Sequence, residues 1–571
     1  MKHFKVEDSA FYGCSSLEHV AIPETVQEIG TAAFSGTLWL KEQQQKNPLV
    51  MVNTILVDGE MAEGDILIPE GVTMISGRAF AGCNNLTSVT MPDSVKRIGM
   101  EAFSECSNLV CVARTEKETT EKETAADGQS YPEGMALPEE KRTIGGRAFY
   151  KCSRLKSVTL PEGITAIHYS AFYKCKKLTS IRIPEGVTEL EADVFSGCSR
   201  LNDIVIPESV TTIGQNAFKG TAWLKTQQEE NPLVVVNHIL IDGTMVKGEV
   251  VIPDGVTRIG NGIFSGCTSL ASVTIPDSVT IIDEFSFSGC SSLTDVTIPK
   301  GVKKIGKSAF SGCSSLTSIT IPEGVTAIST TTFYNCKSLK SVTIPKTVKK
   351  IGTYAFSGCS SLTSITIPEG VKTIPEGAFW ECSSLTNVTI PKSMRTIGYF
   401  AFYRCSSLTS ITFPKGITTI GRGAFCECSG LKKVTLPKGL KTIDDEAFYD
   451  CSALKNVTFP DSITRIDSEA FEGTAWLKAQ RKKNPLVVVN HILIDGRTAK
   501  GNVTIPKGVK TVSGSVFYNC TRLKSVTIPS SVTKISEYAF LGCSDKLVIY
   551  GKKDSVAERY AKKKGYSFVV K

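Results

Sequence analysis

The chain has 571 residues, of which 21% are charged and 41% are hydrophobic, an ordinary composition for a folded protein. No stretch approaches 18 uninterrupted apolar residues, which excludes a membrane-spanning helix, and the first residues lack the apolar core of a signal peptide. More than half of the net charge of +9 lies in residues 545–571, and the rest of the chain is nearly balanced, so we expect no nucleic-acid partner.

A repeat of 23 residues runs through the chain. Seventeen of the 19 cysteines fall on one series that begins at Cys14 and advances in steps of 23 to Cys543. The long gaps after positions 14, 198 and 451 are each three steps, so they keep the same frame. A fixed period held over such a length is typical of a solenoid, which grows along one axis without splitting into separate cores. We therefore predict a β-rich solenoid built from 23-residue coils.

Each coil is predicted to contain a strand, a turn and a second short inward-facing segment. In one coil, Leu316, Ile319 and Ile321 have the apolar alternation of a half-buried strand. Pro322 and Gly324 follow, and these residue types suit the second and fourth positions of a turn. A Phe lies three residues before nearly every position of the cysteine series, which accounts for 20 of the 26 Phe. Rings repeated at one position predict a buried stack along the solenoid axis.

Residues 1–113 are predicted to form the N-terminal part of the solenoid. Val6 occupies the place that Ile328 has in a later coil, so the chain opens halfway through a coil. We therefore expect further sequence upstream, including an export signal.

A longer variant replaces two coils at three places, which begin at Thr37, Thr221 and Thr474. Each copy runs through a polar stretch, expected to be helical, to Asn-Pro-Leu-Val and then to Asp-Gly, with two strands and a brief interruption between them. His238 and His491 occupy equivalent places in two copies, but the first copy has Thr54 there. We interpret these segments as scaffold rather than as ligand or catalytic sites.

Residues 114–142 are different in kind. They begin with a low-complexity run of Thr, Glu and Lys that has no hydrophobic periodicity, which predicts a solvated loop. The loop takes the room of about one coil between Cys106 and Cys152, and the frame resumes in the main array, residues 143–545.

A lane of Ser and Thr is predicted on the strand face of the main array. Seven residues after each cysteine position the strand usually carries Thr, and two residues earlier it often carries Ser. Thr suits exposed strands and pairs well across them, which is a purely structural explanation. Extended solenoid faces also bind extended partners. Ser-x-Thr ranks occur in ice-binding solenoids too, but Asp295, Asn387 and Lys433 interrupt this lane. The candidate ligand surface comprises Thr297, Ser318, Thr320, Ser341, Thr343, Ser364, Thr366, Thr389 and Thr412.

An aromatic stripe follows the core Phe residues directly. Rings in a line can stack on sugars, although such rings more often cover the hydrophobic shell of neighbouring coils. The candidates are Tyr334, Trp380, Tyr403 and Tyr449.

The cysteines and histidines indicate no enzyme. Each recurring Cys lies between a core Phe and a core Leu, so we expect a buried ladder of free thiols. A disulfide ladder is the first alternative, disfavoured by parallel Cβ vectors, and a metal site is the second, disfavoured because no C-x-x-C pair occurs. Cys111 and Cys426 lie off the series and are the candidates for exposed, modifiable thiols. The five His form no constellation with Ser, Cys or Asp, and there is no phosphate-binding glycine loop.

Residues 546–571 leave the repeat and predict a C-terminal α/β cap. Asp554 or Ser555 is expected to cap a helix that ends at Gly565, and a strand from Phe568 to Val570 follows. Such a unit seals the open end of a solenoid. We interpret its lysines as a solvated face rather than an anionic docking site.

The L-x-x-I-x-I-P-x-G-V-x-x-I-x-x-x-A-F-x-x-C unit, shown well by residues 305–316, resembles the BspA-like, treponemal-type leucine-rich repeat. The stretches 549–551 and 557–561 also resemble the cap common in that family. The resemblance implies a leucine-rich-repeat solenoid. It also implies a surface-exposed or secreted protein, since such proteins come from host-associated bacteria and some anaerobic protists, and several are adhesins for matrix proteins. This sequence shows no signal peptide or wall anchor of its own.

We therefore expect a non-enzymatic, monomeric adhesin that binds host or other cell-surface proteins through its strand face, at the cell surface or in secreted form. It should need no cofactor and should not insert into membranes. A carbohydrate-binding surface protein that uses the aromatic stripe is the first alternative. A repeat scaffold for protein–protein interaction, with no ligand of its own, is the second.

Overall fold

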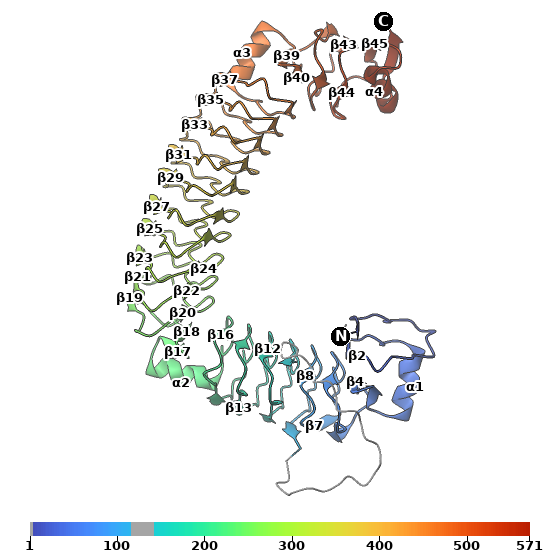
Figure 1. Ribbon diagram of the computed structural model, residues 1–571, viewed down its shortest axis with the longest axis vertical. Coiled ribbons are helices and arrows are strands. Elements are labelled where there is room, and N and C mark those ends of the chain that lie inside the picture. Colours follow the sequence, from blue (N-terminus) through green and yellow to red (C-terminus); the bar gives the residue numbers. More distant parts are fainter. Residues whose placement is uncertain (1–3, 116–141) are drawn as a thin grey trace. The chain divides into compact units, whose positions relative to one another are not determined.

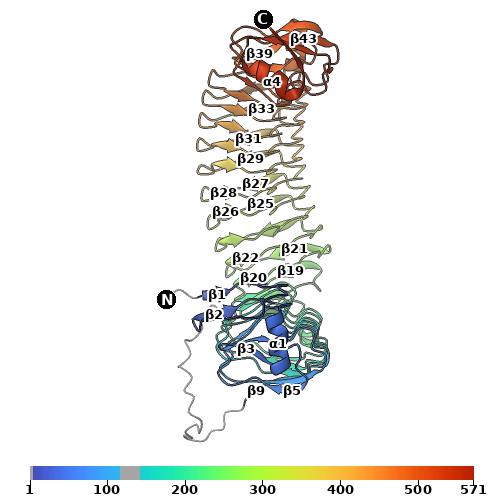
Figure 2. The same ribbon diagram turned by 90° about the vertical axis from the view of Figure 1, so that its right-hand side faces the viewer.

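The computed structural model describes residues 4–115 and 142–571, so the predicted loop at 114–142 lies almost entirely outside the described residues (Figure 1). The chain divides into two compact units, Met1–Met245 (unit 1) and Val246–Lys571 (unit 2). Within each unit the coils stack along one axis, and Figure 2 shows the strands of unit 2 one above another. The predicted β-rich solenoid is confirmed.

Two strand ladders run through the stacked coils. The long ladder consists of the strands that follow the cysteine positions. The short ladder consists of the strands, most of them two residues long, that follow the turns. Ser318 pairs with Ser341 in the long ladder, and Ile328 pairs with Ile351 in the short ladder, both in parallel. Partners are 23 residues apart in these pairs, so the period of the sequence is the register of the sheets.

The strands of unit 1 follow this plan. The long ladder contains β5 (Gly64–Leu67), β7 (Leu86–Met91), β9 (Cys111–Arg114), β11 (Ser157–Val158), β13 (Ser180–Arg182) and β15 (Asp203–Val205). The short ladder contains β4 (Ile55–Asp58), β6 (Met74–Ile75), β8 (Arg97–Ile98), β10 (Thr143–Ile144), β12 (Ala166–Ile167), β14 (Glu189–Leu190) and β16 (Thr212–Ile213). At the start of the chain β1 (Phe4–Val6) pairs with β2 (Val26–Ile29).

The strands of unit 2 continue the same alternation. The long ladder contains β19 (Gly248–Val251), β21 (Leu270–Thr274), β23 (Asp295–Thr297), β25 (Ser318–Thr320), β27 (Ser341–Thr343), β29 (Ser364–Thr366), β31 (Asn387–Thr389), β33 (Ser410–Thr412), β35 (Lys433–Thr435), β37 (Asn456–Thr458), β41 (Gly501–Thr504) and β43 (Leu523–Thr527). The short ladder contains β20 (Arg258–Ile259), β22 (Ile281–Ile282), β24 (Lys304–Ile305), β26 (Ala327–Ile328), β28 (Lys350–Ile351), β30 (Thr373–Ile374), β32 (Thr396–Ile397), β34 (Thr419–Ile420), β36 (Thr442–Ile443), β38 (Arg465–Ile466), β42 (Thr511–Val512) and β44 (Lys534–Ile535).

The three long variants each form the predicted helix and two strands, and the two strands pair as an antiparallel hairpin. The helices are α1 (Leu38–Lys46), α2 (Ala222–Glu230) and α3 (Ala475–Lys483). The hairpins are β3 (Val50–Val52) with β4, β17 (Val234–Val236) with β18 (Ile239–Asp242), and β39 (Val487–Val489) with β40 (Ile492–Asp495).

A Thr at the cysteine position starts each of these helices. Thr37 Oγ1 donates to the carbonyl of Phe34 (2.8 Å) and accepts from the backbone N–H of Leu40 (3.1 Å). Thr221 and Thr474 make the same two bonds in their copies. A thiol is a poor acceptor, whereas a Thr hydroxyl is a good helix N-cap. The exchange of Cys for Thr at these three positions therefore supplies the cap with which each helix begins.

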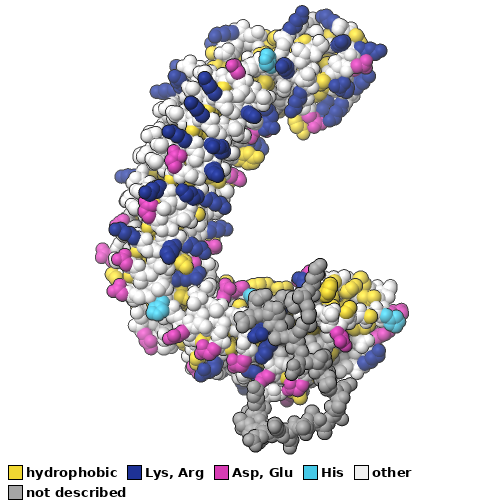
Figure 3. All heavy atoms as spheres, viewed as in Figure 1, with side chains coloured by type: hydrophobic (Ala, Val, Ile, Leu, Met, Phe, Trp, Pro, Cys, Tyr) yellow, Lys and Arg dark blue, Asp and Glu magenta, His cyan; other side chains and the backbone are white. Residues whose placement is uncertain are grey.

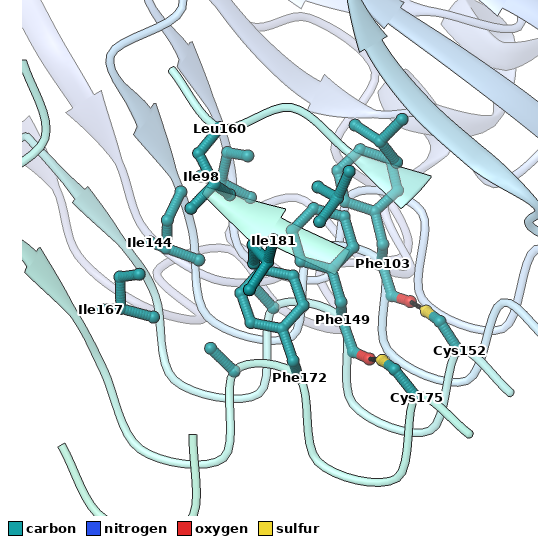
Figure 4. Packing of buried hydrophobic residues seen from close by; sticks show 14 of the residues in the cluster. Ile98, Phe103, Ile144, Phe149, Cys152, Leu160, Ile167, Phe172, Cys175 and Ile181 are labelled. Carbon is teal, nitrogen blue, oxygen red and sulfur yellow. Dashed lines mark hydrogen bonds between the residues drawn. The ribbon is translucent and has the colours of Figure 1, made fainter. Parts of the chain in front are cut away.

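The core is a stack of phenylalanines beside a ladder of thiols. Within unit 1 the rings of Phe103 and Phe149 lie 5.1 Å apart and are nearly parallel, and from Phe264 to Phe471 in unit 2 consecutive rings are 5.1–5.7 Å apart. Cys152 Sγ donates to the carbonyl of Phe103 (2.9 Å), and Figure 4 shows this bond beside the stack. The thiol thus satisfies a buried backbone carbonyl as well as filling space.

The predicted cap is present. Helix α4 (Val556–Lys564) begins after Ser555, whose Oγ accepts from Glu558 N–H, and ends at Gly565, which has the left-handed φ of +75°. Strand β45 (Val548–Gly551) continues the long ladder and pairs with β46 (Ser567–Val570). The buried Tyr560 and Ala561 of α4 cover the last core residues.

Three positions depart from the expected pattern. Cys14 lies on the series but is exposed, as is Phe11, because few coils cover them in the structure. Cys426, predicted to be an exposed thiol, is buried; it occupies the stripe position between those of Tyr403 and Tyr449 in the neighbouring coils. None of the helices in residues 4–115 and 142–571 is long and apolar enough to cross a membrane.

Candidate functional site

The Ser/Thr lane lies on the outer surface of the long ladder in unit 2. All nine candidates from Thr297 to Thr412 are exposed, while the residue between each Ser and Thr points into the core. Thr320 lies opposite Thr343, and Thr366 lies opposite Thr389, so the hydroxyls form ranks across parallel strands. The lane ends near the C-terminus, where Ser525 is buried and donates to Asn502.

The aromatic stripe is not continuous. Tyr334 is exposed, whereas Trp380, Tyr403 and Tyr449 are half-buried. Cys426 takes the stripe position between the last two, so the rings fall into separate groups. The proposed sugar-binding residues therefore do not form one platform.

Four rings come together instead in an aromatic cluster, which we define as Tyr354, Trp380, Phe400 and Tyr403. The Trp380 ring lies 4.3 Å from Tyr403, 5.4 Å from Phe400 and 6.3 Å from Tyr354, centroid to centroid. The neighbouring Tyr399 is 56% exposed. The cluster thus joins two stripe residues to two rings that sequence reasoning missed.

Glycines in the following coils make room for the two missed rings. A Cβ on Gly377 would meet the Tyr354 ring at 2.2 Å, and a Cβ on Gly423 would meet the Phe400 ring at 2.2 Å. Tyr354 and Phe400 both hold a positive φ, which is strained for a bulky side chain. A glycine one coil after an aromatic, at the same position, was the available sequence signal.

Charged side chains border the cluster. Tyr403 Oη donates to Glu427 (2.6 Å), and the Arg404 guanidinium lies over the Tyr403 ring and bonds Glu427 (2.8 Å) and Glu381 (3.2 Å). Burial, followed by the bond to Glu427, raises the pKa of Tyr403 to about 12. The bonds from Tyr403 and Arg404 lower the pKa of Glu427.

An open groove of about 610 Å³ runs beside these charges. It is lined by Ser360, Glu381, Ser383, Arg404, Ser406, Glu427, Ser429, Asp450 and Ser452. A hydroxyl on each successive coil, between carboxylates and a guanidinium, offers donors and acceptors at the spacing of the solenoid.

The two off-series thiols differ in environment. Cys111 is half-buried and accepts a bond from Ser157 Oγ (3.4 Å). Burial, with the nearby carboxylates of Glu427, Glu446 and Asp450, raises the pKa of Cys426 to about 12. Since the thiolate is the reactive form, Cys426 is unsuited to modification.

The histidines of the long variants lie in a structural setting. His491 Nδ1 contacts the carbonyl of Gly508 (3.1 Å), in a hairpin whose Asn490 bonds the carbonyl of Pro460. Among the residues that the structure describes, no group of three His, Cys, Asp or Glu is arranged to hold a metal ion.

The repeat also matches a known family. Six copies of the BspA-type leucine-rich repeat region match residues 2–110, 58–126, 128–237, 246–363, 349–478 and 497–560. The class of protein is therefore a leucine-rich-repeat solenoid. The chain belongs to the BspA-type leucine-rich-repeat family.

Three solved structures illustrate the similarity to known chains. A leucine-rich repeat protein from Bacteroides ovatus is 23% identical, with 88% of this chain and 94% of that chain covered and a TM-score of 0.31. A leucine-rich cell surface protein from Faecalibacterium prausnitzii is 25% identical, with 73% and 87% covered and a TM-score of 0.27. A leucine-rich repeat protein from Eubacterium ventriosum is 22% identical, with 72% and 82% covered and a TM-score of 0.27. No curated protein matches the chain.

Proposed function

We propose that this chain is a non-enzymatic adhesin, at the cell surface or secreted, that binds a host or other cell-surface protein along the Ser/Thr lane. The observation that carries the proposal is the run of exposed hydroxyls from β23 to β37 on parallel strands. Such a lane is flat, weakly charged and long, which suits an extended partner that meets many coils at once. The family membership supports a binding or scaffold role.

Two charged substitutions in the lane test the proposal. Thr343→Glu with Thr366→Glu places two carboxylates on exposed strand sites. The core should stay intact, but a partner that docks on the lane would have to bury these two charges, which costs free energy. The assay is binding of the purified chain to an array of matrix proteins, with salt varied. We expect the wild-type chain to bind one of them saturably and the variant to bind at least about tenfold more weakly.

A matched control places the same charges off the lane. Thr418→Glu with Thr464→Glu alters exposed threonines beside the short ladder and should keep protein binding. Equal loss in both variants would show that the lane is not the binding surface. Absence of saturable binding by the wild-type chain to every protein of the array would refute the adhesin and favour the scaffold.

The aromatic cluster favours a second candidate, the binding of a glycan. Aromatic rings stack on sugar faces, and the nearby groove supplies hydroxyl, carboxylate and guanidinium groups that bond sugar hydroxyls. Tyr403→Ala with Tyr449→Ala should abolish saturable binding to a polysaccharide array and spare protein binding. Retention of glycan binding by that variant would refute this candidate site.

A further inference from the structure

The net charge of the two units differs in sign. Residues 246–571 contain 42 Lys and Arg against 24 Asp and Glu, a net charge of +18, whereas residues 1–245 contain 23 against 32, a net charge of −9. The near balance along the chain conceals this difference. Figure 3 shows Lys and Arg side chains over much of unit 2.

Many of these cations lie on one surface, which we call the basic face. It consists of the exposed positions ten, thirteen and fourteen residues after the cysteine position, in the turn and the short ladder. From Lys300 to Lys441 these positions contain two acidic residues, Glu323 and Glu369. The twelve basic residues, all exposed, are Lys300, Lys303, Lys304, Lys346, Lys349, Lys350, Lys372, Lys392, Arg395, Lys415, Lys438 and Lys441.

The cations of the basic face are not neutralised by carboxylates of the described residues. In the part of the chain that the structure describes, none of the twelve forms an ion pair. Arg395 instead bonds backbone carbonyls of its own turn, and Lys349 Nζ lies 3.5 Å from the Lys346 carbonyl. Elsewhere in unit 2, Arg404 and Arg481 are paired with carboxylates. Unpaired like charges repel one another, and a bound polyanion would relieve that repulsion.

The geometry of the basic face fits a linear ligand. The short-ladder strands β24, β26, β28, β30, β32, β34 and β36 lie in consecutive coils. Six of these seven coils carry cations of the basic face, so the cations follow one another along the axis, and the coil of β26 carries Glu323 instead. At about 4.8 Å per coil, the six steps from the Lys300 coil to the Lys441 coil span about 29 Å. Exposed Thr326 and Thr418 and half-buried Thr396 lie among the lysines and provide neutral hydrogen-bonding groups.

We propose that the basic face binds a linear anionic polysaccharide that carries sulfate or carboxylate groups. Eleven of the twelve cations are lysines, whose ammonium groups act as point charges. Arginine is favoured instead where a phosphate is bound through bidentate hydrogen bonds. The positions that define the face carry no aromatic ring, although proteins that bind single-stranded nucleic acid rely on such rings to stack bases. A sugar chain needs only the spaced cations and hydroxyls that the face provides. This site is separate from the Ser/Thr lane and does not rest on it.

Heparin is the probe for the test, with the whole chain immobilised and salt varied. Lys346→Glu, Lys349→Glu and Lys350→Glu in one variant replace a quarter of the cations with anions, and all three side chains are exposed. We expect the dissociation constant for heparin at about 0.15 M salt to rise at least about tenfold. At this salt concentration only cations within about 8 Å of the ligand attract it strongly, so the cations elsewhere on the chain cannot compensate for the three that are replaced. The salt dependence should become shallower. A second triple variant of Lys415, Lys438 and Lys441 should behave alike, and circular dichroism checks that both fold.

The control makes the same charge change away from the basic face. Lys478→Glu, Lys482→Glu and Lys483→Glu alter the exposed side of α3 and should leave heparin binding within about twofold of the wild type. Equal loss in control and test variants would overturn the proposal, since attraction would then be diffuse. Failure of the wild-type chain to bind heparin would also overturn it.

Duplex DNA is the comparison ligand. If DNA binds as tightly as heparin and its binding is lost in the same triple variant, the ligand of the basic face is a nucleic acid rather than a polysaccharide. Loss of heparin binding in the Tyr403→Ala, Tyr449→Ala variant alone would place the site at the aromatic stripe.

Discussion

Replacement of Gly423 by Ala should disrupt the aromatic cluster from the neighbouring coil. Gly423 has a φ of +59°, and a Cβ built there would lie 2.2 Å from the ring of Phe400. The left-handed conformation costs an alanine about 1–2 kcal/mol relative to glycine. Displacing a packed ring adds about 1–3 kcal/mol. We therefore expect Gly423→Ala to lower the free energy of unfolding by about 2–5 kcal/mol.

The matched control is Gly266→Ala. Gly266 also has a left-handed φ, +77°, but a Cβ there would meet nothing within 4 Å, so only the conformational cost of about 1–2 kcal/mol applies. Guanidinium denaturation followed by circular dichroism gives both values. The change in tryptophan emission between Gly423→Ala and the wild type reports ring displacement around Trp380, since the other three Trp lie in the long variants, far along the sequence from Gly423. In a Phe400→Ala background the excess cost of Gly423→Ala should vanish. Equal costs for the two glycine variants, or an excess that survives without the Phe400 ring, would refute the reasoning.

Three further predictions concern the core, the thiols and acid stability. Phe356→Ala should lower the free energy of unfolding by about 3–5 kcal/mol, measured by denaturation, because the ring is fully buried between two others. Iodoacetamide at mildly alkaline pH should modify exposed Cys14 well before buried Cys426, as judged by mass spectrometry of timed samples, and the reverse order would contradict the assigned burial. Burial opposes ionisation of Glu472, but the hydrogen bond and charge of Arg481 outweigh it and lower the pKa of Glu472. The pair therefore stabilises the fold fully above the ordinary pKa of 4.5 and loses this effect as the pH falls through the lower, folded value. Arg481→Gln, which copies the residue of the other two variants, should flatten that acid dependence, and an unchanged pH profile would rule the pair out as its source.

The architecture follows from the sequence because every coil repeats the same few constraints. The cysteine spacing gives the register, and the position of Phe356 and its equivalents gives the core stack. Pro322 and Gly324 place the turn, and Ser555 and Gly565 delimit the cap helix. Each of these signals is local or strictly periodic, so it survives without knowledge of the three-dimensional contacts.

The candidate surfaces were less predictable because they depend on contacts between coils. The identity of a stripe residue does not tell whether its ring is exposed: Tyr334 is, but Tyr403 is half-buried against Trp380. Cys426 was predicted to be exposed because it lies off the series, yet it is buried at a stripe position where the larger Tyr334 is exposed. Phe400 joins the cluster only because Gly423 leaves room one coil later. The basic face was missed because the net charge was counted over stretches of sequence, whereas its cations come from separate coils and meet on one surface.

The role of Thr37 and its two equivalents was likewise missed. Their hydroxyls occupy the cysteine position and begin the helices, so the series does not lapse there but changes residue. A search for cysteine alone treats these positions as gaps.

The register of the ladders also governs how such a gene can change. Because the regular coils are 23 residues and the long variants are twice that length, an in-frame duplication or loss of one regular coil joins strands that already fit each other. The cap stays in place, and the surfaces of the solenoid lengthen or shorten by one step. A lineage can therefore adjust its avidity for a long partner by recombination between repeats, without inventing a new contact.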